Sequence, residues 1–147
     1  MIKIDEFELL GDLHYDPKDH LWAKIENGNV RVGLDMFGQK AAGTAAYIKL
    51  LPPGREVKKG RAFGSLEAGK YIGPLKSPVN GKILEVNEKV LSNPTLVNTD
   101  PYGEGWFVVI EPSNLDGLND LIHGEENIRA WLEKEIREYK EKGLFPE

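Results

Sequence analysis

The chain contains no cysteine among its 147 residues. This absence excludes disulfides, thiolate nucleophiles and cysteine-based zinc sites. No apolar run approaches the roughly 18 residues that would cross a bilayer as a helix, so no membrane partner is expected. Residues 1–8 include acidic side chains where a secretory signal needs basic and then apolar ones. Together these absences predict a protein that stays in the cytoplasm.

The chain also lacks an excess of basic residues. Its formal net charge is −5, whereas a nucleic-acid-binding protein would display a basic face, so no nucleic-acid partner is expected. Most of the negative charge lies near the C-terminal end, since residues 114–147 contain nine acidic and five basic side chains. The rest of the chain is nearly neutral.

Catalytic and metal-binding patterns are missing as well. The chain shows no Ser/His/Asp set, and the glycines of Tyr102–Trp106 lack the spacing of a dinucleotide loop and precede a strand. His14 and His20 match no usual zinc spacing, His123 lies far away, and no acidic set completes a shell of ligands. The sequence therefore predicts no catalytic residue and no metal.

What the chain does contain is a series of short strand-like runs separated by glycine, proline and asparagine turns. Asn27-Gly28 is a strong hairpin signal because both residues tolerate positive φ. The pattern predicts a mainly β domain, a sandwich or flattened barrel, over residues 21–112, with residues 1–20 as an N-terminal arm. The expected strands cover residues 22–26, 30–34, 45–51, 62–67, 72–76, 82–86 and 107–110, with a short helical turn over 35–42.

The composition changes at Ser113, and residues 113–147 are expected to form a helical appendage packed on the sandwich. Helical spacing predicts a short helix over residues 115–122 and a longer one from Glu125 to about Glu141, stopped near Gly143. The stripe of the longer helix contains a single charged residue, Glu135, among Ile128, Trp131, Leu132, Ile136 and Tyr139. Such a stripe is more often core than interface.

The most informative residue is Lys70, which follows Gly69 between two β-prone stretches. This arrangement predicts a tight hairpin that pushes the ammonium group into solvent. An enzyme that attaches a cofactor to an amine needs that geometry. On these residues alone, an ordinary surface lysine at a turn stays open as the alternative.

A wider frame around Lys70 reads Gly54-x-x-Val57-x-x-Gly60, then Glu67-x-x-Lys70, then Ser77-Pro78-x-x-Gly81-x-Ile83. This frame resembles the lipoyl- and biotinyl-carrier fold, a barrel-sandwich hybrid in which a lysine at a hairpin tip accepts the cofactor.

Two segments flank this frame: His20-Leu21-Trp22 followed by Val30-Arg31-Val32-Gly33, and Asn93-Pro94-x-Leu96-Val97-Asn98-x-x-Pro101-Tyr102-Gly103-x-Gly105-Trp106. They narrow the resemblance to the glycine cleavage system H protein family, within a similarity that keeps its order from about Leu13 to about Leu121. The second segment is the more specific to the family.

The resemblance implies a non-catalytic carrier with lipoate attached covalently to Lys70. The lipoyl group would accept an aminomethyl unit from a pyridoxal-phosphate glycine decarboxylase and pass it to a folate-dependent aminomethyltransferase. A flavin-containing dihydrolipoyl dehydrogenase would then reoxidise it. By the same analogy, Glu67 helps a lipoate-attaching enzyme recognise the hairpin, and His20 packs or hydrogen-bonds near the site.

The hairpin departs from the usual family pattern. This chain reads Glu67-Ala68-Gly69-Lys70-Tyr71 where Glu-Ser-Val-Lys-Ala is usual, and Gly73-Pro74 replaces a polar pair. Gly69 is expected to allow positive φ, Tyr71 to place a ring beside the tether, and Pro74 to stiffen the return strand.

These departures keep other functions open. The main alternative is a lipoate-binding carrier of a sulfur-oxidising, heterodisulfide-reductase-like complex, which resembles this chain in fold and lysine. An unmodified interaction domain also remains open. A biotin carrier is disfavoured because such carriers usually flank the lysine with methionine, and the only methionines here are Met1 and Met36.

Overall fold

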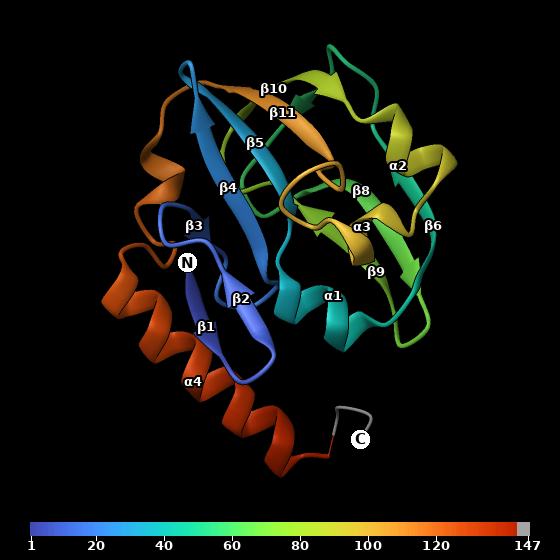
Figure 1. Cartoon of the computed structure of the whole chain (residues 1–147). Coiled ribbons are helices and arrows are strands. Elements are labelled where there is room, and N and C mark those ends of the chain that lie inside the picture. Colours follow the sequence, from blue (N-terminus) through green and yellow to red (C-terminus); the bar gives the residue numbers. More distant parts are fainter. Residues whose placement is uncertain (144–147) are drawn as a thin grey trace.

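The computed structural model describes residues 1–143, in which two antiparallel sheets share one hydrophobic core (Figure 1). One sheet has the order β3-β4-β5-β11-β10-β7 and the other the order β6-β8-β9. The first contains His14–Tyr15, Leu21–Glu26, Asn29–Leu34, Val108–Pro112, Gly81–Val86 and Glu56–Val57, and the second Ala45–Leu50, Ala62–Ala68 and Tyr71–Lys76. The predicted mainly β sandwich is confirmed, and its sheets do not close into a barrel.

Buried and exposed side chains alternate along the strands, and the buried ones form the core. Val30 and Val32 of β5, Ile48 of β6 and Leu66 of β8 are buried, whereas intervening residues such as Glu67 are exposed. The Asn27-Gly28 turn joins β4 to β5 with φ angles of 52° and 80°, as the hairpin signal predicted. The register of each strand therefore follows from which of its faces is apolar.

A second hydrophobic cluster lies at one end of the sandwich. It joins the hairpin of β1 (Ile2–Ile4) and β2 (Phe7–Leu9) to helices α1 (Met36–Ala42) and α4 (Glu125–Glu141). The predicted α4 stripe is confirmed, since its aliphatic members Ile128, Leu132 and Ile136 are buried. In Figure 1, α4 runs beside the β1–β2 hairpin.

The helices within residues 88–122 differ from the sequence prediction. Residues 115–122 form only a 3-10 turn over Asp116–Leu118, because Ile122 pairs with Tyr15 as an isolated β-bridge. Two short helices, α2 (Glu88–Ser92) and α3 (Leu96–Thr99), were not predicted. The division into arm, sandwich and appendage stays a prediction, and residues 144–147 of the appendage lie outside the described residues.

Helix α1 connects the two sheets and lies close to the Lys70 hairpin. Asp35 is its N-cap, and the carboxylate accepts a hydrogen bond of 2.7 Å from the Gly38 N–H. A Cβ atom at Gly38 would lie 2.8 Å from the Cβ atom of His20, so glycine lets the helix lie against that residue. Residues 1–143 contain no helix that is both long and apolar enough to cross a membrane. The cytoplasmic location stays a prediction.

Candidate functional site

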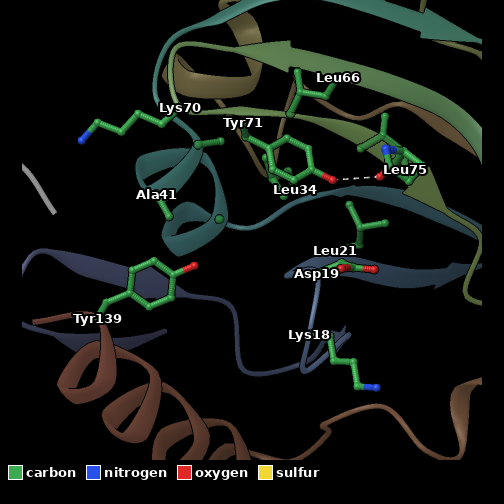
Figure 2. Close-up of a pocket in the computed structure, with 13 residues that line it drawn as sticks. Lys18, Asp19, Leu21, Leu34, Ala41, Leu66, Lys70, Tyr71, Leu75 and Tyr139 are labelled. Carbon is green, nitrogen blue, oxygen red and sulfur yellow. Dashed lines mark hydrogen bonds between the residues drawn. The ribbon is translucent and has the colours of Figure 1, made fainter. Parts of the chain in front are cut away.

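Lys70 lies in the two-residue turn between β8 and β9, where Ala68 pairs with Tyr71. Its side chain is exposed, and within residues 1–143 the Nζ atom has no hydrogen bond or ion pair. Figure 2 shows the ammonium group directed away from the rings of Tyr71 and Tyr139. The sequence prediction of a solvent-directed amine at a hairpin tip agrees with this geometry.

Backbone hydrogen bonds fix the turn, although the Lys70 side chain is exposed. The Lys70 N–H donates to Ala42 O at 2.8 Å, and the Gly69 N–H donates to Thr44 O at 3.1 Å. Ala42 is the last residue of α1, and Thr44 lies in the connection between α1 and β6. Gly69 does not adopt the expected positive φ; the left-handed residue is Gly43 in that connection, with φ +87°.

Asn98 of α3 braces the same connection. Its amide nitrogen donates to Gly43 O and to Gln39 Oε1, each at 2.9 Å, and its carbonyl oxygen accepts from the Ala45 N–H at 2.8 Å. The side chain is thus bonded on both sides of the segment that holds Lys70. Asn98 belongs to a run quoted for the family resemblance, but nothing in the sequence assigned it this role.

A cavity of about 170 Å³ lies at the base of the hairpin (Figure 2). Its lining is mainly apolar and comes from both sheets and from helices α1 and α4. Lys18, Asp19 and Lys70 are its charged residues. The other lining residues are Leu21, Leu34, Gly38, Ala41, Ala42, Leu66, Tyr71, Pro74, Leu75 and Tyr139.

The unusual hairpin residues fit together around Tyr71. Its hydroxyl donates to Pro74 O at 3.1 Å, and a Cβ atom at Gly73 would lie 2.6 Å from the hydroxyl oxygen. Glycine at 73 therefore gives the ring room to lie along β9. Burial, followed by the Asp19 carboxylate, raises the pKa of Tyr71, so the hydroxyl stays protonated at neutral pH. Pro74 is tolerated because β9 is an edge strand.

Glu67 lies on the opposite face of the three-stranded sheet. It pairs with Tyr47 of β6 and Ile72 of β9, and all three side chains are exposed. Leu66, the preceding residue, points to the cavity side. The structure thus separates two predicted site residues, since Tyr71 lines the cavity and Glu67 faces solvent on the outer face.

His20 is buried behind α1 between two carboxylates. Its Nδ1 atom lies 2.9 Å from Asp35 Oδ2, and its Nε2 atom lies 2.7 Å from Glu135 Oε1 of α4. Only a protonated imidazole donates from both nitrogens. Its backbone φ of +60° is held by hydrogen bonds to Asp16 and Asp35. His20 therefore links α4 to the N-cap of α1 and contacts Gly38, which lines the cavity.

The charge of His20 follows from these neighbours. Burial by itself lowers its pKa, but the Asp35 carboxylate and then Glu135 outweigh that effect and raise the pKa to about 9. Sequence reasoning did not find the pair. The available signal was the single acidic residue in the apolar stripe of α4, together with a histidine expected near the site.

The other two histidines lie together in the structure. The rings of His14 and His123 stack with centroids 4.0 Å apart. Among residues 1–143, no group of three or more histidine, aspartate or glutamate side chains is placed to hold a metal ion.

Comparison with known proteins identifies the family. The family model described as the glycine cleavage H-protein matches residues 13–135. The chain belongs to this family. A glycine cleavage system H protein 2 from Aquifex aeolicus is 41% identical over 141 residues, which cover 90% of this chain and 88% of that protein. The H protein of Myxococcus xanthus is 42% identical over 113 residues, covering 75% and 87%.

A solved structure agrees with this assignment. The crystal structure of a glycine cleavage system H protein from Mycobacterium marinum has a TM-score of 0.71 at 30% identity, covering 81% of this chain and 95% of that one. Glycine cleavage H-proteins are lipoate carriers, so the comparisons support a lipoyl-carrier role in the glycine cleavage system. They give no support to the sulfur-oxidation alternative.

The buried charge cluster predicts a specific pH dependence. Because the pKa of His20 is raised from 6.5 to about 9, its contribution to stability is complete below pH 6.5 and is lost as the pH rises through 9. An NMR titration of the His20 ring measures this pKa directly. Glu135→Gln keeps an acceptor and removes a charge, so it should lower the pKa, whereas exposed Glu133→Gln on the same helix should not. Titration near 6.5 in the unsubstituted protein would contradict the assignment.

Asn98→Ala should destabilise the protein by about 1–3 kcal/mol, because it leaves the polar groups of Gly43 and Ala45 without partners. Urea unfolding measures this loss. Exposed Asn119→Ala is the matched control and should change the free energy of unfolding by less than about 0.5 kcal/mol. Equal effects of the two substitutions would show that the bracing bonds contribute little.

Proposed function

We propose that Lys70 carries a lipoyl group in amide linkage and that the chain acts as a non-catalytic carrier in glycine cleavage. The observation that carries the proposal is the contrast, at the hairpin tip, between an exposed side chain and a fixed backbone. Among residues 1–143, the exposed amine has no ionic partner, and it stands on a backbone fixed by two hydrogen bonds. A modifying enzyme can reach such an amine, and the body of the protein holds its attachment point.

The residues around Lys70 fit the group. Amide formation removes the lysine charge, and Lys70 Nζ has no ion pair within residues 1–143 that this change would break. The neighbouring cavity is lined by leucines and by Tyr71, which suit the apolar chain of the arm. When bound, lipoate supplies a reducible dithiolane that carries an aminomethyl unit.

The protein's own contribution is positional. The hairpin fixes where the arm begins, and tethering raises the effective concentration of its reactive end at each partner. Between partners, the reactive end of the arm can bind in the cavity at the base of the hairpin. Asp19 and the Tyr71 hydroxyl supply polar groups at the cavity, where they can contact an amine.

The partners follow from this role. Glycine decarboxylase would load the carrier, a folate-dependent aminomethyltransferase would unload it, and dihydrolipoyl dehydrogenase would reoxidise it. A lipoate-attaching enzyme must act first. Glu67 on the outer face stands three residues before Lys70, with Tyr47 and Ile72 exposed on either side of it. Its carboxylate is accessible to such an enzyme, which supports a role in recognition.

Lipoylation of Lys70 is tested with a lipoate-attaching enzyme and intact mass measurement. The unsubstituted protein and Lys76→Arg, an exposed lysine on the same hairpin, should each gain one lipoyl increment. Lys70→Arg should gain none while its circular dichroism stays unchanged, because arginine keeps the charge and cannot form the amide. An increment on folded Lys70→Arg would place the modification elsewhere.

The pathway is tested separately with the lipoylated protein. It should support exchange of bicarbonate into glycine by glycine decarboxylase, whereas the unmodified protein and Lys70→Arg should leave exchange at background. A family H protein of established activity serves as the positive control. Background exchange with fully lipoylated protein, in an assay where the control is active, would reject the glycine cleavage assignment and leave the lipoylation result intact.

A further inference from the structure

Tyr139 brings a residue of the C-terminal helix to the site. It lies in the last turn of α4 and lines the cavity together with Lys70 and Tyr71. Figure 2 shows its ring reaching from α4 toward Ala41 of α1. Residues 13–135 match the family model, so Tyr139 lies beyond the part of the chain that the model describes. Its place at the cavity therefore comes from the packing of α4 and not from the family match.

The surrounding contacts fix the position of this ring. Glu135, one helical turn earlier, is bonded to buried His20 at 2.7 Å, and Ile136 is buried. The ring of Tyr139 meets the ring of Phe37 edge-on, with centroids 4.8 Å apart. The following residue, Lys140, forms an ion pair of 2.8 Å with Asp5 in the turn between β1 and β2. The end of α4 is thus anchored on both sides of Tyr139.

The chemistry of the ring suits the end of a lipoyl arm. Aromatic rings make favourable contacts with sulfur, and their faces attract ammonium groups. Burial, followed by the Glu135 carboxylate, raises the pKa of Tyr139, so its hydroxyl stays uncharged at neutral pH. Tyr71 contributes a second ring from the hairpin side, and Asp19 contributes the cavity's one carboxylate among the described residues. Aromatic and acidic groups therefore surround a site next to the attachment point.

We propose that Tyr139 is a positioning residue that holds the sulfur end of the arm, with its aminomethyl cargo, against the cavity. This inference rests on the proposed lipoylation of Lys70. The ring would exclude water from the carbon between sulfur and nitrogen and so slow loss of the cargo. In that loss one water molecule is consumed, its oxygen goes to the carbon, and the carbon–sulfur and carbon–nitrogen bonds both break. The sulfur becomes a thiol, the carbon leaves as formaldehyde and the nitrogen leaves as ammonia.

The test follows cargo loss without any partner enzyme. The reduced, lipoylated protein is loaded with excess formaldehyde and ammonia, which is the reverse of the loss reaction. After rapid desalting, intact mass reports the fraction that is still loaded. Tyr139→Ala should lose the cargo roughly tenfold faster than the unsubstituted protein, and Tyr139→Phe should stay within about twofold, because it keeps the ring. Tyr47→Ala removes an exposed ring from the outer face of the three-stranded sheet and should leave the rate of cargo loss unchanged.

An NMR measurement on the unsubstituted protein makes the result independent of folding in the variants. The ring protons of Tyr139 should shift on loading, and those of Tyr47 should not. Unchanged Tyr139 signals, or equal loss rates for Tyr139→Ala and the unsubstituted protein, would overturn the positioning role and leave lipoylation standing. Absence of any lipoyl increment on the unsubstituted protein would instead overturn the proposed function, and this inference with it.

Discussion

The two backbone hydrogen bonds that join the Lys70 hairpin to the end of α1 are the constraint on which the site depends. Without them, the β8–β9 turn would project from the end of the three-stranded sheet with no hydrogen bond to the neighbouring helix or its connection. With them, Lys70 has a fixed relation to α1, to the cavity and to the second hydrophobic cluster. A carrier needs this combination, because the reach of a tethered group is defined only if its base does not move.

The same constraint explains the arrangement of residues that lie far apart in the sequence. Asn98 secures the segment that accepts the two bonds, and the Asp35 side chain caps the helix that ends in that segment. His20 then ties Asp35 to Glu135, so the C-terminal helix is held against α1 by a buried, charged bridge. Such a bridge contributes more to fixing one geometry than to net stability, because its desolvation is costly.

The sequence predicted the parts that depend on local pattern. The Asn27-Gly28 hairpin, the alternating strands and the bounds of α4 were correct, since turn chemistry and apolar period act within a few residues. The Lys70 hairpin was correct for the same reason. Residues 115–122 were wrongly predicted as a helix because the pairing of Ile122 with Tyr15, more than 100 positions earlier, decides their conformation.

The elements and contacts that the sequence did not predict depend on residues far away in the chain. The β1–β2 hairpin is short and is stable only where α4 and α1 cover its apolar face. Asn98 and Glu135 act on residues more than 50 positions away, and their types alone do not reveal a partner. Resemblance to the family gave Lys70 its proposed role, whereas Tyr139 lies outside the matched residues and its place at the cavity emerges only from the packing of α4.

The most direct test of the central claim is hydrogen exchange at the backbone amides of Gly69 and Lys70. Both lie in a solvent-exposed turn, yet Lys70 donates to the last residue of α1 and Gly69 to the connection that follows it. We predict that they exchange as slowly as hydrogen-bonded amides within β8. Exchange at the rate of an unstructured peptide would mean that the hairpin is not fixed to the body of the protein, and the account of the site would be wrong.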